Sequence, residues 1–214
     1  MGYEELARMT PEAREKYIEI IRSIPPEKRL GTAIEHDVAI PRVLSILREF
    51  DIGYMIVGSY AASAYGFTRR THDLDVVAAL APEYVPRLTN ALGEEFYFHQ
   101  QSALEAIKRR DMVNAIHLNS GVKIDFWILH DDEYSQVQFS RRQCLDFEGI
   151  QACVASPEDT ILSKLLRYRI TPSDRQLDDV RGILVVREGR LDWDYLHNWA
   201  DKLGVVDLLR DIAV

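Results

Sequence analysis

Two aspartates separated by one residue are the first feature of this sequence with a spacing suited to chemistry. Asp73 and Asp75 fall at the start of an apolar run, residues 74–79, whose composition is typical of a β-strand. On a strand, residues i and i+2 project to the same face, about 7 Å apart. Two carboxylates at that spacing suit one or two hard divalent cations, which prefer oxygen ligands.

A third aspartate, Asp125, belongs to a second predicted strand at residues 122–129. The apolar residues of this strand alternate and would take its buried face: Ile124, Phe126 and Ile128. Asp125 would then stand on the opposite face, with Lys123 and Trp127. If the two strands are neighbours, three carboxylates converge, and a divalent metal is what mainly relieves their mutual repulsion.

Gly58 and Ser59 form a candidate phosphate-binding turn. They lie between a short strand-like run, residues 54–57, and a helix-permissive stretch, residues 60–64. A glycine and a serine at a strand-to-helix turn let the backbone approach an anion closely, with helix N–H groups and the serine hydroxyl as donors.

The charged candidates also have ordinary explanations. Asp73 and Asp75 can be read as solvated charges on a strand edge, although Gly58 and Ser59 nearby in sequence favour the metal interpretation. Arg69 and Arg70, between the turn and the aspartates, would either offset triphosphate charge or lie on the surface as loop charges.

The elements that must position these residues alternate between strands and helices. Strands are predicted at residues 54–57, 74–79, 113–118 and 122–129, and helices at 41–50, 60–64, 82–92 and 103–110. The last two strands flank Asn119-Ser120-Gly121 and should form a hairpin. The pattern predicts an α/β (α+β) protein, with a small mixed sheet flanked by helices.

The two ends of the chain look different from this centre. A helix is predicted at residues 3–24, followed by a proline break and a linker. Residues 138–147 and 150–154 are predicted as strands, and everything after Ser156 as helix, because Ser156-Pro157 supplies a cap and a first-turn proline. We therefore expect three regions: an N-terminal helix and linker at 1–40, a central α/β domain at 41–155, and a mainly helical C-terminal region at 156–214.

Composition and charge restrict the class of protein. The chain has 214 residues and a formal net charge of −8, which argues against broad nucleic-acid binding through a basic surface. Its two cysteines, Cys144 and Cys153, fit neither a disulfide framework nor a zinc module, so we expect them to be reduced and to fill space in a hairpin. Without a signal-like start or an apolar run of spanning length, a cytoplasmic location is expected.

The candidate residues together resemble the signature of the polymerase-beta-type nucleotidyltransferase superfamily. The sequence shows Val57-Gly58-Ser59, then Asp73-Leu74-Asp75 after thirteen residues, then Val122-Lys123-Ile124-Asp125-Phe126. It is closest to the bacterial branch of lincosamide- and aminoglycoside-type nucleotidyltransferases and abortive-infection toxin transferases, which often show an Arg-x-Thr-x-Asp-x-Asp run like residues 69–75. The resemblance covers residues 54–129 well and the helical tail loosely.

The resemblance implies a nucleotidyltransferase sheet and a mechanism. An acceptor hydroxyl would attack the α-phosphate of a nucleoside triphosphate such as ATP and release pyrophosphate. Asp73 and Asp75 would bind the metal, magnesium or alternatively manganese, and Asp125 would share a second metal or act as the base. The remaining nucleotide-binding residues would be Gly58, Ser59, Arg69, Arg70 and Lys164. From its helix alone, Lys164 could equally be a solvated lysine with a buried stem.

Three functions stay open at this stage. In the first, the acceptor is a small hydroxylated molecule. The excess of acidic over basic residues favours this function. In the second, a toxin-type transferase acts on RNA or a partner protein, with residues 108–110 and 141–142 as a local basic groove. The third is a catalytically silent partner-binding module, which the three retained carboxylates argue against. A homodimer is compatible with each.

Overall fold

The structure is a computed structural model that describes residues 9–34, 38–67, 71, 73–147 and 150–213. The chain divides into two units. The sheet unit comprises Ile34–Val57 and Thr71–Ala155. The helical unit comprises Met1–Ala33, Gly58–Arg70 and Ser156–Val214. Each unit is therefore assembled from segments that are separated in the sequence.

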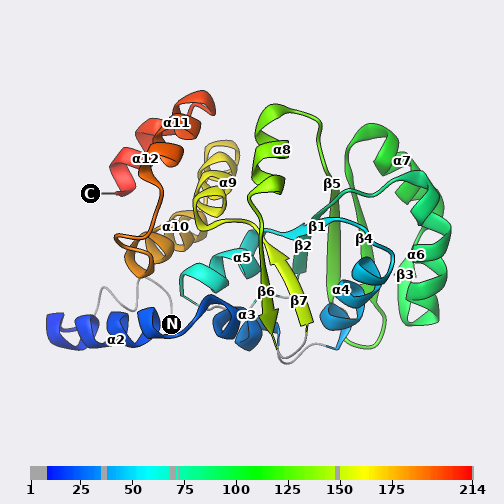
Figure 1. The fold of residues 1–214 in the computed structure, drawn as a ribbon, viewed down its shortest axis with the longest axis horizontal. Coiled ribbons are helices and arrows are strands. Elements are labelled where there is room, and N and C mark those ends of the chain that lie inside the picture. The colour runs from blue at the N-terminus through cyan, green and yellow to red at the C-terminus, as the bar shows by residue number, and fades with distance from the viewer. Residues whose placement is uncertain (1–8, 35–37, 68–70, 72, 148–149, 214) are drawn as a thin grey trace. The chain divides into compact units, whose positions relative to one another are not determined.

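The sheet unit is built on a mixed sheet, which in the described part of the chain has seven strands in the order β3-β4-β5-β2-β1-β7-β6 (Figure 1). Its strands are β1 (Tyr54–Ile56), β2 (Asp73–Ala78), β3 (Phe96–Phe98), β4 (Met112–His117), β5 (Lys123–Ile128), β6 (Gln143–Phe147) and β7 (Ile150–Val154). β2 runs parallel to β5 and antiparallel to β1. The predicted mixed α/β fold is confirmed, and so is the β4–β5 hairpin. The short strand β3 was not predicted.

Alternation of apolar residues gives β2 and β5 one buried face. The even-numbered residues of both strands are buried: Leu74, Val76, Ala78, Ile124, Phe126 and Ile128. Burying these side chains on one face is the main favourable contribution to folding. The odd-numbered residues are left on the other face, where the polar and charged side chains of both strands gather.

Helices of the sheet unit cover its strands and one another. They are α4 (Ala39–Glu49), α6 (Val85–Leu92), α7 (Gln100–Arg109) and α8 (Glu133–Ser140), with short 3-10 turns at Pro82–Tyr84 and Gly93–Glu95. α4 contacts β7 and α6, α6 contacts β3, and α7 contacts β4. Figure 1 shows α6 and α7 beside the β3–β4 edge of the sheet.

Helix α8 corrects one prediction. Residues 138–147 were expected to form a single strand, but α8 continues to Ser140 and β6 begins only at Gln143. The start of this helix is fixed by Asp132, whose carboxylate accepts hydrogen bonds from the Ser135 backbone N–H at 3.0 Å and from its hydroxyl at 2.6 Å. These hydrogen bonds lower the pKa of Asp132. Asp132 is therefore the N-cap of α8.

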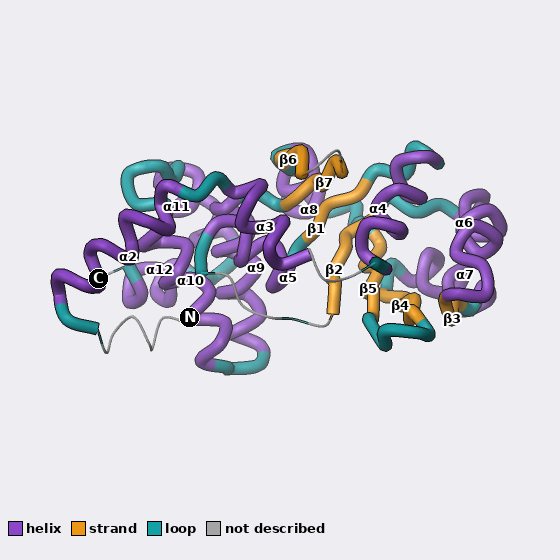
Figure 2. Tube along the Cα trace, turned by 90° about the horizontal axis from the view of Figure 1, so that it is seen from below, coloured by secondary structure: helices purple, strands orange, loops and turns teal. Residues whose placement is uncertain are grey.

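The helical unit contains the remaining helices (Figure 2). These are α2 (Pro11–Ser23), α3 (Pro26–Ile34), α5 (Gly58–Tyr65), α9 (Pro157–Ile170), α10 (Asp174–Val186), α11 (Trp193–Lys202) and α12 (Val206–Ile212). One of them departs from prediction, because α3 occupies the stretch expected to be a linker, whereas α12 lies in the C-terminal stretch expected to be helical. α9 contacts α5, α10 and α11. The predicted cap of α9 is confirmed, since Ser156 Oγ accepts from the Asp159 N–H at 3.1 Å.

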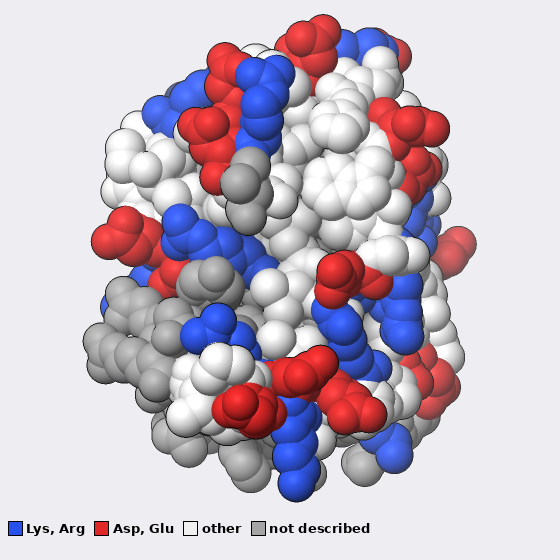
Figure 3. All heavy atoms as spheres, turned by 90° about the vertical axis from the view of Figure 1, so that its left-hand side faces the viewer, with Lys and Arg blue, Asp and Glu red and all other residues white. Residues whose placement is uncertain are grey.

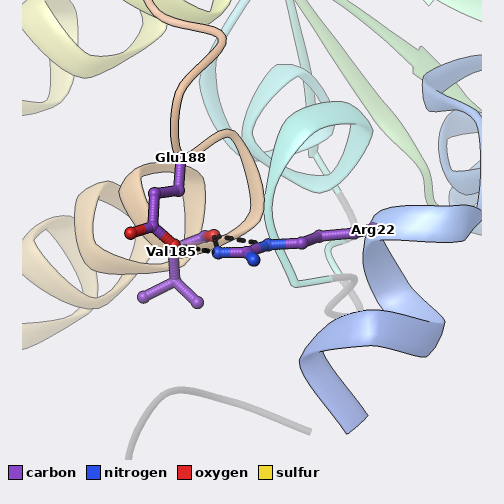
Figure 4. Close-up of polar contacts among 3 residues, drawn as sticks. All are labelled: Arg22, Val185 and Glu188. Carbon is purple, nitrogen blue, oxygen red and sulfur yellow. Dashed lines mark hydrogen bonds and ion pairs between the residues drawn. The ribbon is translucent and has the colours of Figure 1, made fainter. Parts of the chain in front are cut away.

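Helix α2 is attached to the end of α10 by one arginine (Figure 4). Arg22 donates two hydrogen bonds to the Val185 carbonyl, from Nη2 at 2.7 Å and from Nε at 3.2 Å, and it forms an ion pair with Glu188. Apolar contacts lie beside this polar attachment, where Tyr17 and Ile21 pack against a buried cluster containing Phe67. The described part of α2 has no buried residue of its own, so these contacts hold it in place.

The β6–β7 hairpin corrects the prediction for the cysteines. Cys144 and Cys153 are register partners in the antiparallel pair and are joined by a disulfide. The predicted hairpin is confirmed, but the expectation of two reduced thiols was wrong for this structure. Spacing alone does not reveal register, and register is what brings the two sulfur atoms together.

A membrane span is not found among the helices of the described residues, none of which combines the required length with sufficient apolar character.

Candidate functional site

The three aspartates lie on two adjacent strands in the middle of the sheet. β2 and β5 are parallel and in register, so that Asp75 is the Cα partner of Asp125 and Asp73 is the partner of Lys123. All four residues therefore belong to the same face of the sheet. Burial increases along the group, because Asp73 is exposed, Asp75 is half-buried and Asp125 is only 6% exposed. The condition set by the sequence for the three carboxylates to converge, that the two strands are neighbours, is met.

Asp125 is held by a lysine two residues before it. The Lys123 Nζ lies 2.9 Å from Asp125 Oδ2. The other carboxylate oxygen, Oδ1, is buried and accepts no hydrogen bond from any described residue. An ionised carboxylate has acceptor capacity on both oxygens, and a buried acceptor without a partner is costly. Asp125 therefore has one satisfied oxygen and one that is ready for another donor or a cation.

Neighbouring carboxylates stabilise the protonated form of Lys123. The hydrogen bond to Asp125 raises the pKa of Lys123, with partial burial acting in the opposite direction. The charges of Asp73 and Asp75 raise the pKa further. Lys123 is thus a permanent cation on the acidic face of the sheet.

Trp127 is a residue of this face whose role the sequence did not reveal. Its indole Nε1 donates a hydrogen bond to Asp75 Oδ1 at 3.1 Å, while its side chain remains 38% exposed. The parity that placed Trp127 on the Asp125 face was predicted correctly. The link to Asp75 was not, because it depends on the β2–β5 register.

The donor chemistry of this face fits a divalent cation. Asp73 and Asp75 offer carboxylate oxygens, the preferred ligands of hard cations, and the buried Oδ1 of Asp125 lacks a partner among the described residues. Across the described ranges, however, no three or more His, Cys, Asp or Glu side chains are arranged as a group that could hold a metal ion. One oxygen of Asp125 is already paired with Lys123.

The predicted strand–turn–helix at Gly58 is confirmed. Helix α5 begins at Gly58, two residues after β1 ends at Ile56. Gly58 has a φ of 66°, in the left-handed region that favours glycine, which explains this residue at this point of the chain. Ser59 follows in the first turn of α5. Phosphate binding by Gly58 and Ser59 stays a prediction.

Lys164 is neither exposed nor solvated. It is 6% exposed, and its Nζ lies 2.6 Å from Asp179 Oδ2, which joins α9 to α10. The alternative of a solvated lysine with a buried stem is therefore wrong. No pattern in either helix selects Asp179 as the partner of Lys164. Arg69 and Arg70, the other two cationic candidates, lie outside the described residues.

One cleft of the helical unit has a volume of about 450 Å³. Its walls come from α2, α10, the loop after α10, and α11 and α12, and include Ile18, Leu184, Leu191, Trp193 and Ile212. The charged groups in these walls are already paired, Arg22 with Glu188 and Arg181 with Asp178. None of the predicted site residues that the structure describes lines this cleft.

The basic clusters considered for nucleic-acid binding are partly used within the sheet unit. Arg110 donates to Asp131 at 2.5 Å and to the Leu129 carbonyl at 2.9 Å. Arg142 donates to the Phe139 carbonyl at 2.6 Å, and its guanidinium lies over the Phe139 ring. On the face shown in Figure 3, basic and acidic side chains are interspersed rather than gathered into one basic patch.

The fold has counterparts among solved structures. An antigenic nucleotidyltransferase-like protein from Paracoccidioides brasiliensis is similar, with 18% identity, a TM-score of 0.51, and coverage of 86% of this chain and 92% of that one. JHP933 from Helicobacter pylori has 19% identity, a TM-score of 0.47 and coverage of 83% and 79%. ANT(2")-Ia in complex with adenylyl-2"-tobramycin has 13% identity, a TM-score of 0.45 and coverage of 80% and 94%. No curated protein matches the sequence.

The first of these likenesses shows a nucleotidyltransferase-like fold. Residues 37–210 match the family described as "Nucleotidyltransferase of unknown function" (DUF6036), and the chain belongs to this family. The protein is thus a nucleotidyltransferase, as the resemblance of its motifs implied.

Proposed function

We propose that the protein transfers a nucleoside monophosphate from a nucleoside triphosphate to a hydroxyl acceptor, with magnesium, or alternatively manganese, as the required metal. The observation that supports this proposal is the register of β2 and β5, which puts Asp73, Asp75 and Asp125 on one face of neighbouring strands. Carboxylates kept this close repel one another, and a bound divalent cation would offset this repulsion.

In the proposed reaction, the acceptor oxygen forms a bond to the α-phosphorus while the bond from that phosphorus to the bridging oxygen breaks. Pyrophosphate leaves with the electrons of the broken bond. Asp73 and Asp75 would hold the metal, which supplies charge neutralisation for the triphosphate when bound. Catalysis of this kind depends mainly on positioning and electrostatics, with little covalent chemistry by the protein.

Asp125 is proposed as the base. Its Oδ2 is occupied by Lys123, whereas Oδ1 has a free acceptor position with respect to the described residues. The acceptor hydroxyl would donate its proton toward Oδ1 as the new bond forms. Gly58 and Ser59 are proposed to bind the β- or γ-phosphate, and Arg69, Arg70 and Lys164 to complete nucleotide binding. Lys164 would do so only at the cost of its contact with Asp179.

A small molecule is the proposed acceptor. The net charge of −8 and the internal pairing of Arg110 and Arg142 both disfavour a polyanionic acceptor such as RNA. The catalytic core is proposed to lie within residues 41–155. We propose a cytoplasmic enzyme, because nucleoside triphosphates are its substrates. The Cys144–Cys153 disulfide counts against that location, since such bonds are rare in reducing compartments.

Incubation of the full chain with each α-labelled nucleoside triphosphate, magnesium and a cell extract tests the proposal. Label on small molecules, lost with EDTA and with Asp73→Asn, is the expected result. Label on RNA or protein would contradict the proposed acceptor class but support the proposed reaction. Absence of label with all four nucleotides would favour the silent partner-binding module instead.

A further inference from the structure

We propose that Lys123 supplies the positive charge that a second divalent cation would otherwise supply, so that this site binds a single divalent cation per chain. The inference rests on the proposed function and specifies how the same site is neutralised. Lys123 is then a positioning residue, which acts through Asp125.

The position of Lys123 is the first support. Its Nζ lies 2.9 Å from Asp125 Oδ2, and its Cα is the register partner of Asp73 on the neighbouring parallel strand. The ammonium group therefore belongs to the same face as the three aspartates. Lysine carries a compact point charge on a long stem, which suits it to a place among carboxylates.

The charge count is the second support. Asp73, Asp75 and Asp125 contribute three negative charges and Lys123 one positive charge, leaving two negative charges. Before a nucleotide binds, one divalent cation neutralises that remainder. A second divalent cation at Asp125 would have to enter beside an ammonium group that already occupies Oδ2, and like charges at such short range repel strongly.

The ligand arrangement is the third support. A carboxylate shared between two metals must offer oxygens to both, but one oxygen of Asp125 is committed to Lys123. Consistent with this, the described residues contain no group of three acidic, His or Cys side chains placed to hold a metal. Asp73 and Asp75 are left as the protein's ligands for one ion, and Asp125 Oδ1 is left for the acceptor.

The test counts manganese ions bound to the full chain. Electron paramagnetic resonance during a Mn²⁺ titration, without nucleotide, gives the number of ions bound per chain. We expect one ion for the wild type, one for Lys123→Arg and two for Lys123→Met. Lys108→Met removes an exposed lysine of the same unit and should leave the count at one.

Each outcome has a distinct meaning. Two ions in the wild type would overturn this inference and leave the proposed reaction intact. A count of one in a folded Lys123→Met would also overturn it, because Lys123 would then not be what excludes the second ion. Mn²⁺ that fails to bind the wild type at all would contradict the proposed function itself. The wild-type count keeps the inference falsifiable even if Lys123→Met does not fold.

Discussion

Trp127 and Asp75 are joined across two parallel strands, with the indole Nε1 of Trp127 3.1 Å from Oδ1 of Asp75. Trp127 lies on β5, two residues beyond Asp125, and Asp75 lies on β2 as the register partner of Asp125. The hydrogen bond limits the rotation of the Asp75 carboxylate and occupies one of its oxygens. Asp75 is therefore oriented before any cation binds.

Replacing Trp127 with Phe tests this orientation. Trp127→Phe keeps an aromatic ring but loses the N–H donor, so we expect Mn²⁺ affinity to fall about 10-fold, the low end for a hydrogen bond to a charged group. Calorimetric titration with Mn²⁺ measures the change. Trp193→Phe, in the helical unit, should leave the affinity unchanged. Unaltered affinity in Trp127→Phe would mean that the contact does not orient Asp75.

Asp125→Asn should separate binding from chemistry. If Asp73 and Asp75 alone bind the metal carried in with the nucleotide, the variant should keep magnesium-dependent nucleotide affinity. Loss of the base should slow the chemical step at least about 100-fold. Calorimetry and single-turnover transfer measure the two effects. Parallel loss of binding and turnover would instead place Asp125 among the metal ligands.

Arg29→Met should stabilise the fold. Arg29 is 4% exposed, and its Nε and Nη1 have no hydrogen-bond partner among the described residues. Burial, and then the charge of Arg187, lower the pKa of Arg29 to about 10. The folded protein thus holds this proton less tightly than the unfolded chain. The free-energy cost of burying the charged guanidinium is therefore fully present below about pH 10 and is relieved only above it.

Methionine keeps an apolar stem at this position without the charge, and the expected gain at pH 7 is on the order of 1–3 kcal/mol. Urea denaturation measures it. Lys28→Met, at an exposed position of the same helix, should change stability by less than about 0.5 kcal/mol. A lower midpoint for Arg29→Met would show that the guanidinium has a favourable partner in solution.

Lys164→Met should destabilise the helical unit. Both side chains of the Lys164–Asp179 pair are 7% exposed, so removing the lysine leaves a buried carboxylate without its cation. The expected loss is about 3–5 kcal/mol, and adding Asp179→Leu should recover much of it. Thermal denaturation of the single and double variants checks this. A double variant no more stable than the single one would contradict the account.

Strand periodicity predicted which face of its strand each residue of the candidate site occupies. Alternation around Asp75 and Asp125 gave the face of each carboxylate, and the glycine before Ser59 marked the start of a helix. Periodicity does not give register, however. The Trp127–Asp75 contact and the Cys144–Cys153 bond both depend on which residues of two strands stand side by side.

Contacts between distant segments were beyond prediction for a related reason. Lys164 and Asp179 meet because α9 packs against α10, and nothing in either helix's pattern selects that pairing. The side-chain pattern of residues 138–147 alone suggested a strand. The cap at Asp132 instead starts a helix that continues to Ser140, and this caused the error.

The attachment of Arg22 to Val185 has a consequence for how the protein is made. The two residues are 163 positions apart, and the helical unit as a whole is assembled from the beginning, middle and end of the chain. During synthesis the whole sheet unit is translated before α10. Helix α2 must then wait, without its partner, until nearly the entire chain has been translated. We expect nascent chains that stop at residue 155 to present α2 to proteases and chaperones, and full-length chains to protect it.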